Sequence, residues 1–239
     1  MKRPLINFLL LITIQFIAGG KVFSQDQPRP YSDPQRYAEA MAEFAVQDQQ
    51  SPPPANAIVF VGSSSIRRWD TLLEDMRPLT VINRGFGGSN MRDAVHHIEA
   101  AVLTYKPRAV VLYEGDNDLS SYGASPAMVM AAFEEFYQQL HSALPATRLY
   151  LLSIKPSLSR ADEWPVMNST NAMLKSSCAE KPHCAYIDVA TPTFSKDGSL
   201  SESLFVEDLL HMTPAGYAIW TKTIKPVLMK SELQYEKRE

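Results

Sequence analysis

The stretch Ile58-Val-Phe-Val-Gly62-Ser63-Ser64-Ser65-Ile66 decides how this chain folds. Its consecutive apolar residues predict a buried strand, and Gly62 then allows a sharp turn into a helix. In a parallel sheet, such a turn lies at the carboxyl end of its strand, where ligands of these sheets bind. We therefore expect a parallel sheet that holds a serine hydroxyl at its carboxyl edge.

The rest of the chain repeats this alternation of strand and helix. Apolar runs predict strands at Ala57–Val61, Thr80–Asn83, Ala109–Tyr113, Leu149–Ser153 and Ala185–Val189. Helical patterns lie at Asn90–Tyr105, Pro126–Leu144, Trp164–Ala179 and Pro214–Met229. This alternation predicts a single α/β domain in which helices cover both faces of a five-stranded parallel sheet. The 239 residues, 45% of them hydrophobic, suffice for one stable core.

The first 50 residues differ from the rest. Residues 1–24 combine two basic residues, an apolar run and a plausible cleavage point after Ser24, which predicts an export signal. The alternative is an uncleaved anchor, but the apolar run is shorter than the roughly 20 residues of a spanning helix. Residues 25–50 read as a loose tether up to Asp33, followed by an amphipathic helix that ends before Ser51. The domain proper spans residues 51–239, and we expect a periplasmic or extracellular protein.

Charge and cysteine content narrow the possible partners. Removing the signal takes three basic and no acidic residues, so the net charge falls from −3 to −6. An acidic chain without a basic stripe predicts no nucleic-acid partner. In an oxidising compartment, Cys178 and Cys184 can form a disulfide, which we favour over two free thiols. Zinc is disfavoured because His183 is the only additional ligand nearby and four are normally required.

Two polar segments follow the first two strands. Ser63, Ser64 and Ser65 could supply a nucleophile, although a serine-rich turn can equally be a helix cap. The segment Asn83-Arg-Gly-Phe-Gly-Gly-Ser-Asn90 lets backbone approach a ligand closely. A dinucleotide loop is its rival interpretation, but the Gly-x-Gly-x-x-Gly spacing is absent.

Two further segments complete the set. Asn117, in a polar turn after the third strand, could donate a hydrogen bond to an oxyanion, although Asn and Asp are also ordinary turn residues. The segment Asp208-Leu-Leu-His211 places a carboxylate and an imidazole one helical turn apart, as the base and its orienting acid require. The carboxyl ends of parallel strands share one edge, so we expect the four segments to line one crevice.

Together these segments resemble the SGNH hydrolases, also called GDSL esterases and lipases, over residues 58–228. The resemblance implies a three-layer α/β/α, flavodoxin-like fold with Ser64 as nucleophile, and Asp208 and His211 completing a catalytic triad. It also implies an oxyanion hole formed by Ser64, Gly88 and Asn117. Neither metal nor cofactor is implied. Ser63 stands where the family usually has Asp, so the hydrogen bonding of the turn must differ.

The resulting hypothesis is an exported esterase that forms an acyl-enzyme on Ser64, with a small-molecule or carbohydrate ester as substrate. Short acyl chains or acetylated carbohydrates are favoured. An acyltransferase of the same fold is the first alternative. The second is a catalytically silent carbohydrate-binding protein, suggested by Ser63 and by aromatic residues such as Trp69, Phe86, Tyr122 and Trp164. We expect no membrane span after signal cleavage, and the sequence leaves the oligomeric state open.

Overall fold

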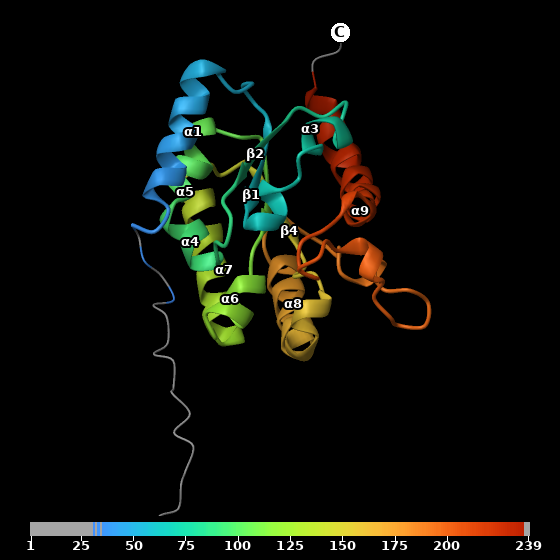
Figure 1. The fold of residues 1–239 in the computed structure, drawn as a ribbon. Coiled ribbons are helices and arrows are strands. Elements are labelled where there is room, and N and C mark those ends of the chain that lie inside the picture. Colours follow the sequence, from blue (N-terminus) through green and yellow to red (C-terminus); the bar gives the residue numbers. More distant parts are fainter. Residues whose placement is uncertain (1–30, 32, 34, 237–239) are drawn as a thin grey trace, which may run out of the picture.

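A five-stranded parallel sheet forms the centre of the computed structural model, which describes Tyr31, Asp33 and residues 35–236 (Figure 1). The strands are β1 (Ile58–Gly62), β2 (Val81–Gly85), β3 (Ala109–Tyr113), β4 (Arg148–Leu152) and β5 (Cys184–Ile187). Their order across the sheet is β2-β1-β3-β4-β5. Gly62, the last residue of β1, pairs with Gly85 on one side and Tyr113 on the other. The register therefore aligns the ends of the first three strands, and the predicted fold class is confirmed.

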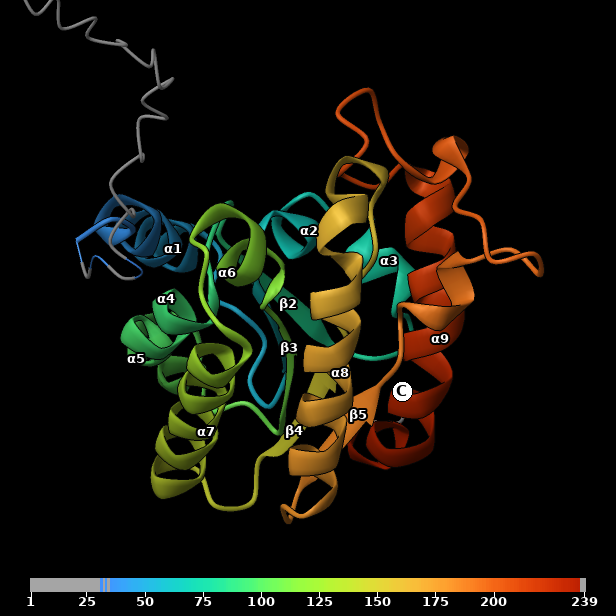
Figure 2. The ribbon, with the colours of Figure 1, turned by 90° about the horizontal axis from the view of Figure 1, so that it is seen from below.

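Helices cover both faces of the sheet (Figures 1 and 2). One face packs against α1 (Ala38–Gln50), α4 (Met91–His96), α5 (Ile98–Ala101), α7 (Pro126–Ala143) and α8 (Trp164–Ala179). The other packs against α2 (Ser64–Arg67), α3 (Leu72–Asp75) and α9 (Pro214–Glu232). Side chains alternate along each strand, so Val59 and Val61 point to the first face and Ile58 and Phe60 to the second. Both faces of the sheet are therefore buried in hydrophobic core.

Three helix predictions need correction. The helix expected over residues 90–105 is divided into α4, α5 and a 3₁₀ turn (Leu103–Tyr105), because His97 and Val102 leave helical backbone geometry. The polar turn expected around Asn117 is instead the short helix α6 (Asp116–Ser121). The last helix continues past Pro226 to Glu232, beyond its predicted end.

Tyr31, within the predicted tether, contacts the body of the domain. The Tyr31 hydroxyl donates to Asp118 Oδ1 at 2.5 Å, and the Tyr31 carbonyl accepts from the Asn90 side chain at 3.0 Å. Most of the predicted tether lies outside the described residues. The predicted signal, residues 1–24, lies outside the described residues. Within the described part, no helix is long and apolar enough to cross a membrane.

A disulfide links the end of α8 to the start of β5. It joins Cys178 and Cys184, with an S–S distance of 2.06 Å and a Cα–Cα distance of 5.4 Å. Cys178 is fully buried in the core, whereas Cys184 is half-buried. The bond therefore anchors the short loop that leads into the edge strand.

Candidate active site

The turn after β1 presents Ser64 at the carboxyl edge of the sheet. Gly62 has φ of +151°, and a Cβ at this position would lie 2.2 Å from the Tyr113 carbonyl oxygen, so only glycine fits. Ser63 accepts hydrogen bonds from the Ile66 and Arg67 N–H groups through its carbonyl, which starts α2. Ser64 is the first residue of this helix and is half-buried. Its hydroxyl is thus positioned by backbone constraints on both sides.

Ser64, His211 and Asp208 form one hydrogen-bonded chain. His211 Nε2 lies 2.9 Å from Ser64 Oγ, across 147 positions of sequence. His211 Nδ1 lies 2.5 Å from Asp208 Oδ2. The two ring nitrogens therefore contact the serine and the carboxylate in the way that general-base activation of a hydroxyl requires.

A tight turn, rather than a helix, holds Asp208 and His211. Leu209 adopts a left-handed conformation with φ of +55°, so the expected helical turn is absent. Asp208 Oδ1 accepts the backbone N–H groups of Leu210 and His211 at 2.9 and 2.8 Å. The carboxylate thus closes the turn with one oxygen and holds the imidazole with the other.

The same contacts keep Asp208 ionised. Partial burial acts to raise the pKa of this carboxyl, but hydrogen bonds from the His211 ring and from two backbone N–H groups outweigh it. The net effect holds the pKa of Asp208 well below its usual range. An anionic partner for the imidazole is therefore maintained throughout the neutral and mildly acidic range.

Gly88, on the loop after β2, and Asn117, in α6, lie beside Ser64's strand end. Gly88 has φ of +82°, and Asn117 Nδ2 donates to the Ser89 carbonyl at 2.9 Å, which ties α6 to the Gly88 loop. Within residues 35–236, no protein acceptor takes the backbone N–H of Ser64 or Gly88. These donors, together with the second Asn117 N–H, can bind a developing oxyanion.

The N-terminal segment supports the Gly88 loop. Tyr37 Oη donates to the Gly87 carbonyl at 3.3 Å, and Arg36 Nη2 donates to the Gly88 carbonyl at 3.0 Å. The Arg36 guanidinium also lies 4.9 Å from the ring centres of both Tyr37 and Tyr122. Sequence reasoning missed this support because the segment precedes every recognised motif.

Buried carboxyl groups lie behind the same loops and were also missed. Glu114, which directly follows β3, accepts from Ser89 Oγ at 2.5 Å, and its other oxygen has no hydrogen-bond partner among the described residues. Burial, reinforced by the Asp118 charge, raises the pKa of Glu114 well above its usual value. Burial likewise raises the pKa of both Asp93 and Asp118 to about 6. The sequence feature that could have indicated this group is an acidic residue directly after a predicted strand, which is the position of Glu114.

Trp69, Phe86, Trp164 and His141 make structural contacts. Trp69 and Phe86, which the sequence suggested as stacking platforms, are 1% exposed and pack inside the molecule. Trp164 packs against Phe194. Both ring nitrogens of His141 contact backbone carbonyls. Trp69 and Phe86 are therefore not available to stack against a carbohydrate at the surface.

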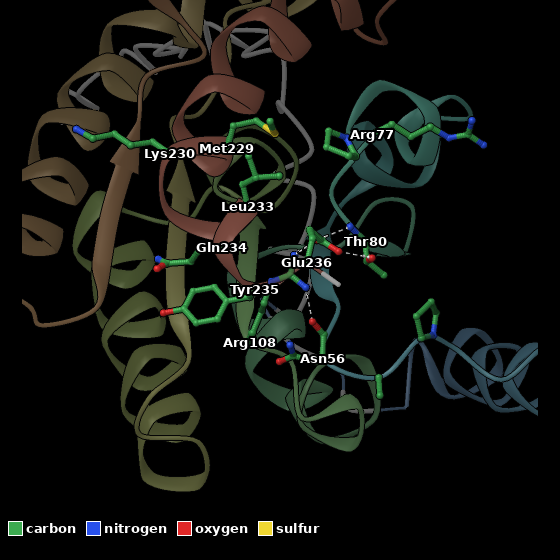
Figure 3. A pocket seen from close by; sticks show the side chains of 13 residues that line it. Asn56, Arg77, Thr80, Arg108, Met229, Lys230, Leu233, Gln234, Tyr235 and Glu236 are labelled. Carbon is green, nitrogen blue, oxygen red and sulfur yellow. Dashed lines mark hydrogen bonds and ion pairs between the residues drawn. The ribbon is translucent and has the colours of Figure 1, made fainter. Parts of the chain in front are cut away.

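A large hollow lies at the opposite end of the molecule (Figure 3). Its cavity volume is about 1430 Å³, and its lining includes residues that precede β1, β2 and β3, so it borders the amino edge of the sheet. Glu236 fills part of it, accepting from both the N–H and the hydroxyl of Thr80 at 2.7 Å and from Arg108. It contains neither Ser64 nor His211.

Within the described residues, no three His, Cys, Asp or Glu side chains are grouped as they would be around a metal ion.

A three-layer α/β/α domain with hydrogen-bonded serine, histidine and aspartate at its carboxyl edge has the arrangement of a serine hydrolase. The chain belongs to the GDSL-like Lipase/Acylhydrolase family, whose model matches residues 53–219. The predicted resemblance is thereby confirmed, and the protein is a hydrolase acting on ester bonds. No curated protein matches the chain in sequence.

Several solved structures share the fold. A GDSL-like lipase from Bacteroides thetaiotaomicron is 17% identical, with a TM-score of 0.68 over 80% of this chain and 98% of that one. A variant of an acetyl-xylooligosaccharide esterase from Geobacillus stearmophilus is 15% identical, with a TM-score of 0.60 over 78% and 99%. A carbohydrate esterase family 3 structure from Talaromyces cellulolyticus is 14% identical, with a TM-score of 0.59 over 73% and 97%. At these identities the likeness concerns the fold.

Proposed function

We propose that the protein hydrolyses carboxylic esters through an acyl-enzyme on Ser64. His211 Nε2 accepts the Ser64 proton as Oγ attacks the ester carbonyl, and Asp208 stabilises the resulting imidazolium. The imidazolium then protonates the leaving alcohol. Water, deprotonated by His211, attacks the acyl-enzyme and releases the acid and free Ser64. The observation that carries this proposal is the continuous hydrogen-bond chain from Ser64 Oγ through His211 to Asp208.

The oxyanion formed in each step is assigned to three donors. These are the backbone N–H groups of Ser64 and Gly88 and the side-chain amide of Asn117. Their convergence from three strand ends supports the assignment, because such donors act best when they are fixed before the charge develops.

Substitution of the nucleophile and the base tests this mechanism. Ser64→Ala and His211→Ala should each lower kcat for p-nitrophenyl acetate by roughly 10⁴-fold or more. Ser169→Ala and His96→Ala are matched controls, since both side chains are exposed on helices away from the triad. Near-normal turnover in both Ser64→Ala and His211→Ala would contradict this mechanism.

For the substrate, we favour short acyl chains, with acetylated carbohydrates as the leading class. The support is the fold shared with an acetyl-xylooligosaccharide esterase and with a carbohydrate esterase. A panel of p-nitrophenyl esters of increasing chain length, run beside acetylated xylose and glucose, should show kcat/KM falling with chain length. A preference for long chains would redirect the proposal to lipid esters. Ester formation on an added sugar would identify a transferase.

The proposal includes export. Residues 1–24 have the charge and apolar pattern of a signal, although they lie outside the described part of the chain. N-terminal sequencing of protein recovered from the periplasm or medium should begin at Gln25. Full-length protein in the membrane fraction would instead support an anchor.

A further inference from the structure

Arg160 connects a loop outside the recognised motifs to the candidate oxyanion donor. It lies in the 3₁₀ segment Leu158–Glu163, after β4, and its side chain is 13% exposed. Its guanidinium donates to Asp116, to Asn117 Oδ1 at 3.0 Å and to Ser121 Oγ at 3.0 Å. All three acceptors belong to α6, so one side chain contacts both the first turn and the last residue of this short helix.

These contacts determine which way the Asn117 amide faces. A carboxamide has one accepting and one donating end, and here the accepting Oδ1 meets a permanent cation. The donating Nδ2 meets the Ser89 carbonyl at 2.9 Å. Rotating the amide by 180° would direct NH₂ at a guanidinium and oxygen at a carbonyl, so both contacts oppose it. The cation also withdraws electron density from the amide, which strengthens its N–H groups as donors.

The same segment reaches the turn that carries His211. Lys155 Nζ donates to the Leu210 carbonyl at 2.8 Å and lies 3.6 Å from Asp116 Oδ2. The Ser159 N–H donates to the Leu209 carbonyl at 3.1 Å. Lys155 is 1% exposed, so the link is internal. Residues 155–160 therefore connect the histidine turn to α6 through Asp116.

We propose that Arg160 is a positioning residue that orients and polarises Asn117 toward the oxyanion. This inference rests on the proposed function, since it assumes that charge develops beside Asn117. The effect belongs to the transition state, so loss of Arg160 lowers kcat and leaves KM nearly unchanged. If Arg160 only formed a structural ion pair with Asp116, its effect on kcat would not depend on the presence of Asn117.

A double-mutant cycle distinguishes these roles. Arg160→Met should lower kcat by roughly 10- to 100-fold, as expected for a lost hydrogen bond to a charged group. Asn117→Ala should lower it by roughly 10²- to 10³-fold. In the Asn117→Ala background, adding Arg160→Met should cost less than about 3-fold, because its target is gone. Full additivity of the two losses, or an unchanged kcat in Arg160→Met, would overturn the proposal.

Controls separate folding from positioning. Arg92→Met removes another ion-paired arginine, on α4, and should leave kcat unchanged. Arg160→Lys keeps the charge beside Asp116 but cannot span both Asp116 and Asn117, so its kcat should lie between those of wild type and Arg160→Met. Equal unfolding temperatures of wild type and Arg160→Lys would assign this kcat loss to positioning.

A second measurement does not depend on ester turnover. Phosphate triesters such as diethyl p-nitrophenyl phosphate react once with an activated serine, and mass spectrometry follows the adduct. Arg160→Met should slow this reaction about as much as it slows kcat, whereas equal rates in wild type and variant would contradict the inference. If Ser64→Ala still turns over esters, the proposed function has failed, whatever the cycle shows.

Discussion

The two edges of the sheet hold their buried carboxyl groups in opposite ways. At the amino edge, the fully buried Glu232 carboxylate accepts from Arg108 at 3.2 Å, from Arg148 at 2.5 and 2.7 Å and from Tyr150 at 2.6 Å. At the carboxyl edge, Glu114 is also buried, yet one of its oxygens has no partner among the described residues. Among residues 35–236, the backbone N–H groups of Ser64 and Gly88 also have no protein acceptor there. Buried carboxyl groups therefore occur at both edges, and unused hydrogen-bonding capacity distinguishes the candidate site.

The hollow beside the amino edge shows the same contrast (Figure 3). It is large and contains charged residues, but Thr80, Arg108 and Glu236 satisfy one another. Cavity size alone would have selected the wrong edge. The placement of nucleophile, base and free donors selects the carboxyl edge instead.

The largest expected effect concerns the carboxyl edge. Asp208→Asn should lower kcat by roughly 10⁴-fold, because the amide favours the wrong imidazole tautomer while its oxygen can still close the turn. The unfolding temperature should barely change. Steady-state kinetics checks this, with Asp197→Asn on an exposed loop as the matched control. A loss below 10-fold would mean that Asp208 does not serve the imidazole.

The amino edge should show the opposite pattern. Glu232→Ala leaves Arg108 and Arg148 without their shared buried anion, and should lower the free energy of unfolding by about 3–5 kcal/mol. The kcat per folded molecule should be unchanged. Urea unfolding measures the first quantity. Glu134→Ala, which removes a more exposed partner of Lys181, should cost about 0–1 kcal/mol. Equal losses of unfolding free energy in Glu232→Ala and Glu134→Ala would contradict the expected difference between a buried and a more exposed carboxylate.

Glu114 tests the unsatisfied side of the comparison through pH. Its raised pKa means that folded protein holds a proton that unfolded protein releases, so stability is greatest below the ordinary value of 4.5. Stability is then lost as pH rises toward the folded-state pKa, by up to about 1.4 kcal/mol per pH unit. Glu114→Gln should lack this component. Unfolding free energies at pH 5 and pH 8 should therefore favour the variant increasingly at the higher pH, and a parallel pH dependence would contradict this.

The disulfide should have the smallest effect. Replacing both Cys178 and Cys184 with Ala should lower the unfolding free energy by about 2 kcal/mol, as expected for a loop this short. The unfolding temperature should drop by about 4–8 °C, with activity retained. Reductant should destabilise the wild type and leave the double variant unaffected. A drop in kcat would show that the bond influences the carboxyl edge.

The sequence predicted the sheet well because its strands are buried on both faces and carry strong apolar runs. The break at His97 escaped prediction, since the apolar pattern of residues 90–105 continues through it. Tyr31 was missed for the opposite reason, because a single aromatic residue in a polar segment leaves no periodic signal. Local pattern thus identified the elements and not the contacts that end or anchor them.

The candidate site could be predicted wherever a residue's neighbours in sequence share its task. Ser64, Asp208 and His211 stand in short motifs, and the structure brings them together. Arg160 and Lys155 act on residues about 40 to 55 positions away, and arginine and lysine are common on surfaces, so nothing in their local sequence marked them. Only the three-dimensional structure shows that the Lys155 and Arg160 side chains point toward the Leu210 carbonyl and α6.

The distance in sequence between Ser64 and His211 also bears on how the protein is made. Synthesis delivers the serine early, whereas the imidazole and α9, which helps to cover one face of the sheet, follow almost 150 residues later. A nascent polypeptide halted before residue 205 has neither its base nor the cover for that apolar face. If His211 is the base, as proposed, the growing chain therefore cannot cleave esters until residue 211 has been added.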